Sequence, residues 1–256
     1  MRLLFLGDIV GNAGREAVVS MVPDLRYELG LDYVVANGEN CSGGKGLTPK
    51  HADELLDCGI DVITGGNHTF QHRDLYPYLE STPAVLRPHN YPAGAPGTGI
   101  AEVGNLVVLN LIGRVFMPAD YEDPFRAADD ALKNIPSNRF VLVDLHAEAT
   151  SEKQAMGWHL DGRVTGVVGT HTHVPTADNR VLPGGTAFCT DAGMCGARDS
   201  IIGDEVQAVL RRFLTQMPTR LAPATGPAIL NGLLIEADDT NKRATSIVRC
   251  DRMGPL

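Results

Sequence analysis

Five short polar clusters stand where hydrophobic, strand-like runs of this chain end. They are Gly7-Asp8, Gly38-Glu39-Asn40, Gly66-Asn67-His68, His146 and Gly169-Thr170-His171-Thr172-His173. Open α/β sheets build their sites at the carboxyl ends of their strands, so these side chains are expected to meet. Carboxylates, carboxamides and imidazoles are the ligands that divalent metals take from proteins. The pattern therefore predicts an α/β fold with a metal site at one sheet edge.

The first third of the chain alternates between strand and helix signals. We expect strands over residues 3–6, 33–36 and 61–64, with helices over 15–29 and 48–58 between them. Thr48-Pro49 begins the second helix with a capping residue followed by proline at the first helical position. Strand–helix–strand units of this kind predict parallel pairing with right-handed crossovers.

The rest of the chain is richer in strands. Residues 88–99 are rich in proline and glycine and predict a long loop, and Gly104-Asn105 predicts a hairpin between strands 100–103 and 106–112. Further strands are expected over 140–145, 164–168, 186–190, 231–237 and 244–250, and helices over 124–135 and 203–215. Together these elements predict a mixed α/β chain, and we expect residues 1–256 to form a single domain.

Composition narrows the class of protein. With 256 residues, 43% of them hydrophobic, the chain can bury a full core. A net charge of −9 argues against a partner that is long nucleic acid, but a small phosphate ester stays open because metal charge can outweigh a negative surface. No apolar run reaches the length of a membrane span. Five cysteines without a CxxC pair fit a reduced, cytoplasmic location.

The order of these motifs resembles the calcineurin-like metallophosphoesterase superfamily, and most closely its YmdB-like phosphodiesterases. The resemblance rests on Gly7-Asp8-Ile9-Val10-Gly11, Asn37-Gly38-Glu39-Asn40, Gly66-Asn67-His68-Thr69-Phe70 and Gly169-Thr170-His171-Thr172-His173-Val174. It covers roughly residues 2–200 and includes the Asp191-Ala192-Gly193-Met194 stretch. It implies a layered sandwich of mixed β-sheets flanked by helices. Two positions depart from the superfamily pattern: Val10 stands where Asp-x-His has its histidine, and Glu39-Asn40 replaces Gly-Asp.

The resemblance also implies two metal ions per chain. Asp8, Glu39, Asn40 and His173 would hold one ion, and Glu39, Asn67, His146 and His171 would hold the other. Glu39 would bridge both, and Asn40 would take the place that Val10 cannot fill. The resemblance favours iron, with manganese as the alternative. Two divalent ions and two carboxylate ligands together carry a net charge of roughly +2. This positive charge favours an anionic substrate and lowers the pKa of a bridging water from about 15.7 towards about 7.

His68 and three arginines are candidates for other roles. An imidazole with a pKa near 6.5 can protonate a leaving oxygen, so we expect His68 to point away from the metals and act as general acid. The alternative is a histidine that only positions Asn67. Arg15, Arg114 and Arg198 lie in polar breaks and are candidate phosphate contacts, although each can equally be an ordinary exposed arginine.

The sequence therefore predicts a dinuclear metal-dependent phosphodiesterase that hydrolyses small cyclic nucleotides by attack of metal-bridging hydroxide. The resemblance favours 2',3'-cyclic nucleotides as substrates, and 3',5'-cyclic nucleotides are the alternative. A phosphomonoesterase or nucleotidase is the alternative enzyme, and a metal-bound regulatory module with little catalysis is the alternative of another class. Composition identifies no protein partner and leaves a homo-oligomer open.

Overall fold

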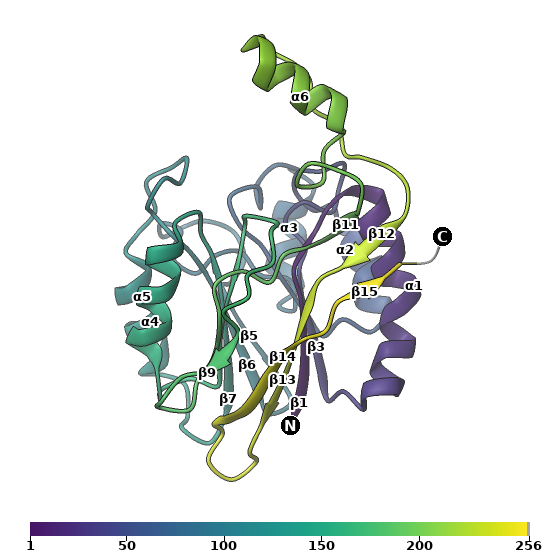
Figure 1. The fold of residues 1–256 in the computed structure, drawn as a ribbon. Helices are drawn as coiled ribbons and strands as arrows, with labels where there is room; N and C mark the ends of the chain where they lie inside the picture. Colours follow the sequence, from purple (N-terminus) through teal and green to yellow (C-terminus); the bar gives the residue numbers. More distant parts are fainter. Residues whose placement is uncertain (255–256) are drawn as a thin grey trace.

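Two large β-sheets pack face to face and carry helices on their outer faces (Figure 1). The structure is a computed structural model that describes residues 1–254. The first sheet has the order β14-β13-β1-β3-β4. Its strands are β1 (Arg2–Leu6), β3 (Tyr33–Asn37), β4 (Val62–Thr64), β13 (Gly232–Ala237) and β14 (Ala244–Arg249).

The second sheet has the order β5-β6-β7-β8-β10-β9, and a small third sheet has the order β15-β12-β11-β2. The strands of the second sheet are β5 (Ile100–Val103), β6 (Leu106–Ile112), β7 (Phe140–His146), β8 (Gly166–Thr170), β9 (Arg180–Val181) and β10 (Ala187–Cys189). Those of the third are β2 (Asp8–Ile9), β11 (Met194–Ala197), β12 (Ala228–Leu230) and β15 (Arg252–Met253).

Helices cover the outer face of each large sheet. Helices α1 (Gly11–Leu29), α2 (Pro49–Asp57) and α3 (Leu75–Ser81) share a buried cluster with the first sheet, whereas α4 (Pro124–Leu132) and α5 (Thr150–Leu160) share one with the second. The sixth helix, α6 (Val206–Thr215), projects from the body (Figure 1). The predicted layered sandwich of mixed sheets flanked by helices is confirmed.

The central strands are apolar on both faces because each face meets another layer. In β1, Leu4 and Leu6 pack towards the helices, whereas Leu3 and Phe5 pack between the sheets. Burial on both faces explains why the strands read as continuous hydrophobic runs rather than alternating ones. The same burial makes the short runs recognisable as strands, since most of their polar residues lie at or near the strand ends.

Strand direction decides where the site forms. β1, β3 and β4 are mutually parallel, and so are β6, β7, β8 and β10. Their carboxyl ends are followed by the polar clusters, which the two sheets thus bring to a common edge. The predicted β5–β6 hairpin is also confirmed, with Val103 opposite Leu106.

Several elements differ from the prediction. Helix α1 begins at Gly11 rather than near residue 15, and β8 lies two residues later than expected. Two helices, α3 and α5, were not predicted. Helix α5 buries Glu152 and Lys153 among its apolar residues, so it lacks the amphipathic pattern by which a surface helix is recognised. Within the described residues, no helix has both the length and the apolar character needed to cross a bilayer.

Candidate metal centre

The predicted ligands come together at the carboxyl edge of the two large sheets. Asp8 lies directly beyond β1, Glu39 and Asn40 follow β3, Asn67 follows β4, His146 ends β7, and His171 and His173 follow β8. Asp8, Glu39, Asn40 and His146 are buried, and the remaining three are partly exposed. Residues from separate segments of the chain therefore face one another.

One group of ligands converges on His146. Its Nε2 lies 3.0 Å from His171 Nδ1, 3.1 Å from Asn67 Oδ1 and 3.2 Å from Glu39 Oε1. Two ligands at right angles on an ion about 2.1 Å away lie roughly 3.0 Å apart. The spacing of Glu39, Asn67, His146 and His171 thus fits the edges of one coordination polyhedron. This is the set expected for one of the two ions.

The second group surrounds Asp8. Asp8 Oδ1 is buried without a hydrogen-bond partner among the described residues, and it lies 3.7 Å from His173 Nε2. Asn40 Nδ2 lies 3.0 Å from that same nitrogen. A buried carboxylate oxygen left unpaired costs about 1–3 kcal/mol or more, and a cation would offset this cost. Asp8, Asn40 and His173 therefore fit a second ion next to Glu39.

Val10 and Asn40 explain how the site departs from the superfamily pattern. Val10 is buried and forms an isolated bridge with Asn40, so the two residues lie on neighbouring backbone segments. Asn40 now presents Nδ2 to His173, while its Oδ1 lies 3.1 Å from His68 Nδ1. A half-turn of the amide would exchange the two atoms and present the oxygen as a ligand.

Each histidine ligand has its second ring nitrogen occupied outside the cluster. His146 Nδ1 lies 2.9 Å from Thr170 Oγ1, and His173 Nδ1 donates to the carbonyl of Ile202 at 2.7 Å. His171 Nε2 lies 3.0 Å from a carboxylate oxygen of Glu148. Such partners fix the tautomer and leave the inward nitrogen free to ligate. Glu148 was not predicted; its position two residues after His146 is the only signal that the sequence offers.

A buried carboxylate supports this arrangement from behind. Asp144 accepts hydrogen bonds from Thr170 Oγ1 at 2.8 Å, Thr64 Oγ1 at 2.5 Å and Asn37 Nδ2 at 3.0 Å. Burial raises the pKa of Asp144 to about 6 in spite of these donors. Through Thr170, Asp144 holds the ring of His146 in its orientation.

The ionisable groups of the cluster shift one another's pKa values. Burial opposes ionisation of Glu39, but the His146 and His68 side chains beside it hold its pKa below the usual range. Burial raises the pKa of Asp8, although His173 and His146 oppose the rise. Burial, together with neighbouring His146, lowers the pKa of His171 to about 3, so this imidazole is neutral at pH 7.

His68 does not point where we expected. Its Nδ1 lies 2.9 Å from Glu39 Oε1, and its backbone N–H donates to Glu39 Oε2 at 3.0 Å. The expected orientation away from the ligand set is therefore wrong: the ring turns towards Glu39, the nearest buried carboxylate. The side chain is 28% exposed and lines the pocket above the cluster, so a ligand can still reach it.

The three predicted arginines do not line this pocket. Arg15 forms an ion pair with Glu54, Arg114 with Asp123 and Arg198 with Asp199. Each guanidinium is paired with a carboxylate outside the pocket, so contact of these arginines with substrate stays a prediction. The pocket, of about 320 Å³, is lined instead by Lys45 together with Glu148, Thr172, Ile202, Asp204 and several of the ligands.

Glycines allow the close packing around the ligands. A Cβ on Gly66 would lie 2.1 Å from Glu39 Oε2 and 2.4 Å from His146 Nε2. A Cβ on Gly169 would lie 1.8 Å from the carbonyl oxygen of Thr190. The glycines of these two motifs are therefore required by the close approach of neighbouring atoms.

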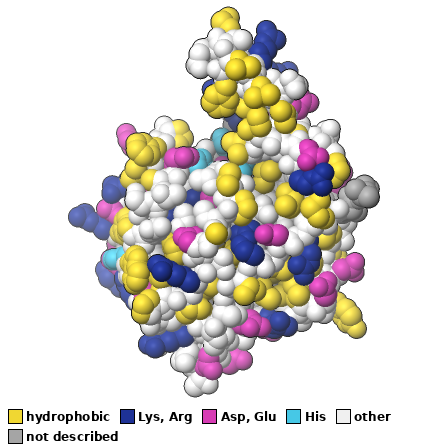
Figure 2. All heavy atoms as spheres, viewed as in Figure 1, with side chains coloured by type: hydrophobic (Ala, Val, Ile, Leu, Met, Phe, Trp, Pro, Cys, Tyr) yellow, Lys and Arg dark blue, Asp and Glu magenta, His cyan; other side chains and the backbone are white. Residues whose placement is uncertain are grey.

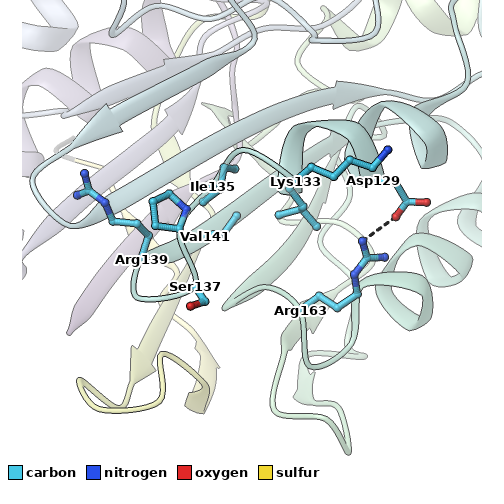
Figure 3. Close-up of a pocket in the computed structure, with 9 residues that line it drawn as sticks. Asp129, Lys133, Ile135, Ser137, Arg139, Val141 and Arg163 are labelled. Atoms are coloured by element: carbon cyan, nitrogen blue, oxygen red, sulfur yellow. Dashed lines mark ion pairs between the residues drawn. The ribbon is translucent and has the colours of Figure 1, made fainter.

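A larger cavity, of about 530 Å³, lies at the opposite end of the second sheet (Figure 3). It is bordered by the end of α4 and the start of β7, and the side chains of Lys133, Arg139 and Arg163 lie around it. Each of these cations has a carboxylate partner: Asp130, Glu102 and Asp129 respectively. None of the predicted ligands lines this cavity, so its size does not make it the functional site.

Known proteins are similar to this chain over nearly its whole length. The family model described as YmdB-like protein matches residues 4–250. A relative from Bacillus subtilis (strain 168), a 2',3'-cyclic-nucleotide 2'-phosphodiesterase, is 46% identical over 257 residues, which cover 97% of this chain and 96% of the relative. A hypothetical protein from Thermus thermophilus has a TM-score of 0.93 at 44% identity, with full coverage of both chains.

A structure described as a novel phosphatase from Mycoplasma pneumoniae is also similar. Its TM-score is 0.92 at 34% identity, covering 99% of this chain and 94% of the other. The resemblance drawn from the motifs is thus confirmed over nearly the whole chain, beyond the stretch in which the motifs lie. The chain belongs to the YmdB-like protein family.

Proposed function

We propose that this protein is a dinuclear metal-dependent phosphodiesterase that hydrolyses small cyclic nucleotides. The 2',3'-cyclic nucleotides are the first substrate class, because the Bacillus subtilis relative carries that activity in its name at 46% identity. The 3',5'-cyclic nucleotides are the second class. The site itself supports a phosphate ester of small size, since its pocket measures about 320 Å³.

One observation carries this proposal: the buried carboxylates of the two ligand sets, Glu39 and Asp8, lie against the two nitrogens of the same His146 ring. Oε1 of Glu39 lies 3.2 Å from His146 Nε2, on the side of the first set. The unpaired Oδ1 of Asp8 lies 3.9 Å from His146 Nδ1 and 3.7 Å from His173 Nε2, on the side of the second. A carboxylate offers two oxygens, so Glu39 can serve both sets at once.

The donor set suits iron, with manganese as the alternative. Nitrogen and oxygen ligands are mixed in both sets, and no cysteine belongs to either, which disfavours a thiolate zinc site. When bound, two such ions polarise the phosphate and supply the hydrolytic nucleophile. Asp8, Glu39, Asn40 and His173 would hold one ion, and Glu39, Asn67, His146 and His171 the other.

The remaining residues of the pocket bind the substrate and move a proton. Lys45, at the wall of the pocket, adds a positive charge near the phosphate. His68 lies beside Glu39 at 2.9 Å, where its imidazole can give a proton to the leaving oxygen of the ribose. Thr172 and Ile202 also line the pocket.

An assay of the purified protein with its metal content measured tests the proposal. Cyclic 2',3'- and 3',5'-nucleotides, nucleoside monophosphates and a nitrophenyl diester form the panel, with Glu39→Ala as the inactive variant and the exposed Glu102→Ala as its control. We expect turnover of a cyclic nucleotide in the wild type and in Glu102→Ala only. Faster turnover of monophosphates than of every diester would assign a phosphomonoesterase instead, in line with the Mycoplasma pneumoniae phosphatase. Two bound metals without any turnover would assign a regulatory module.

A further inference from the structure

Helix α6 and the segment after it form an arm, defined as residues 206–221, that projects from the body of the protein (Figure 1). Within α6 only Val209 is buried. Leu210, Phe213 and Leu214 are 41%, 70% and 82% exposed, and Met217 just beyond the helix is 59% exposed. Positions 210, 213 and 214 share one helical face, and Met217 follows where the helix has ended. Figure 2 shows these hydrophobic side chains gathered on the arm.

A helix of this kind requires a partner. α6 has ten residues, and isolated helices of that length are marginal in water, since packing of the apolar face supplies most helix stability in proteins. Among residues 1–254, nothing buries Leu210, Phe213 or Leu214, so most of the apolar face of α6 is exposed. The surface that covers it must lie on another molecule.

The charge of the arm indicates which surface that is. The arm contains Arg211, Arg212 and Arg220 and no acidic residue. None of these arginines forms an ion pair with any residue from 1 to 254. The other 240 residues carry 19 basic and 31 acidic side chains, a net charge of −12. The arm is thus complementary in charge to the body of its own chain.

A matching surface lies beside the active site. The rim loop, defined as residues 115–122, follows β6 and exposes Val115 at 41% and Phe116 at 85%. Asp120 and Glu122 are exposed in the same loop, and within the described part of the chain their carboxylates have no hydrogen bond or ion pair. The rim loop thus has exposed apolar side chains beside unpaired carboxylates. The arm has exposed apolar side chains beside unpaired arginines.

Both surfaces are continuous with segments that contact proposed ligands. The loop that begins at Gly113 starts beside His146, because the Gly113 N–H donates to the carbonyl of His146 at 3.0 Å. The arm begins just after Ile202, whose carbonyl accepts from His173. Each surface is therefore connected along the chain to a segment that contacts a proposed ligand.

We propose that the arm of one copy of this chain packs on the rim loop of a second copy, and that the contact is reciprocal. Leu210, Phe213 and Leu214 would cover Val115 and Phe116, and the arginines would face Asp120 and Glu122. A reciprocal exchange closes as a two-fold dimer and leaves no arm free.

Charge reversal in sedimentation velocity tests this dimer. We expect the wild type to dimerise, and Arg211→Glu with Arg212→Glu, or Asp120→Arg with Glu122→Arg, to raise the dissociation constant by on the order of 10–100-fold. Mixing the two variants should give a heterodimer. In one of its contacts the reversed arm of one variant meets the reversed rim loop of the other, and in the second contact both surfaces are wild type, so opposite charges meet in both. The variant with all four changes should dimerise with itself. Lys133→Glu with Arg243→Glu, two cations remote from the arm, serves as the control and should dimerise like the wild type.

Three outcomes would overturn the proposal. A wild type that stays monomeric at every concentration would exclude the dimer, and dimers that survive both reversals would place the interface elsewhere. A wild-type monomer that cosediments with vesicles of anionic phospholipid, and loses this binding in the Arg211→Glu, Arg212→Glu variant, would assign the arm to a membrane surface. Circular dichroism of each variant separates these results from misfolding.

Discussion

Lys153 Nζ donates to Asp191 Oδ2 at 2.7 Å, and both side chains are buried behind the metal centre. Asp191 also accepts from the backbone N–H and the hydroxyl of Thr172, and its other oxygen accepts from the Gly193 N–H. Thr172 stands between His171 and His173, whose φ angles of 102° and 65° are unfavourable for residues other than glycine. One buried ion pair therefore holds the loop that carries two proposed ligands.

We predict that Lys153→Met destabilises the fold by about 3–5 kcal/mol, because it leaves the carboxylate of Asp191 buried and uncompensated. Urea unfolding of the metal-free protein measures the change. Adding Asp191→Leu should cost less than the sum of the two single changes, since no lone charge then remains. Lys133→Met, which removes an exposed lysine paired with Asp130, is the matched control and should unfold like the wild type. Equal stability of Lys153→Met and Lys133→Met would contradict this role.

The Glu39→Ala variant should lose both metal ions together, since its carboxylate is the one group shared by the two ligand sets. Elemental analysis after purification in the presence of iron or manganese gives the result. Glu102→Ala, at an exposed ion pair with Arg139, should keep the wild-type content. Full occupancy in Glu39→Ala would refute the bridging role.

Asn40→Ala should lose metal preferentially from one site, because Asn40 belongs only to the set around Asp8 and His173. We expect about half of the wild-type metal content and, in a metal titration, one of two binding steps. Asn90→Ala changes a buried asparagine that is not among the proposed ligands and controls for loss of a buried amide. Two unaltered binding steps would make Asn40 a turn residue rather than a ligand.

His68→Ala should keep both metals and lose roughly 10²–10⁴-fold in turnover of cyclic nucleotides, the range typical of general acid catalysis. A ribose alkoxide requires a proton to leave, whereas a nitrophenolate leaves without one, so the loss with a nitrophenyl diester should be much smaller. His159→Ala, at a surface ion pair with Asp129, is the control. Loss of metal, or equal loss with both substrates, would reduce His68 to a positioning partner of Glu39 or Asn67.

Metal uptake by the metal-free protein should strengthen as the pH rises from 7 towards 9. Burial opposes protonation of His146, but Glu39 and Asp8 beside it raise its pKa to about 9. The imidazole must lose this proton to ligate, so protons compete with metal below pH 9 and the competition fades above it. Calorimetric titration with manganese in buffers of different ionisation enthalpy should show proton release at pH 7. An affinity that does not vary with pH would mean that His146 does not ligate.

The sequence by itself determined the fold class and the proposed ligand set. Strands buried on both faces must be continuous apolar runs, so β1, β3, β4 and β7 could be read from the chain. Because parallel strands end at a common edge, the polar residues after them could be expected to meet. What stays a prediction is that metal ions bind there.

Only the tertiary structure decided the parts that depend on distant neighbours. Helix α5 escaped prediction because Lys153 and Glu152 point inwards, towards partners that no local pattern identifies. The ring of His68 turns towards Glu39 because that buried carboxylate lies 29 residues away in sequence and 2.9 Å away in space. The amphipathic pattern of α6 predicts a helix, but whether its apolar face meets the body or projects from it depends on where the preceding loop directs the chain. Local sequence specifies which groups prefer burial, and packing between remote segments decides what they meet.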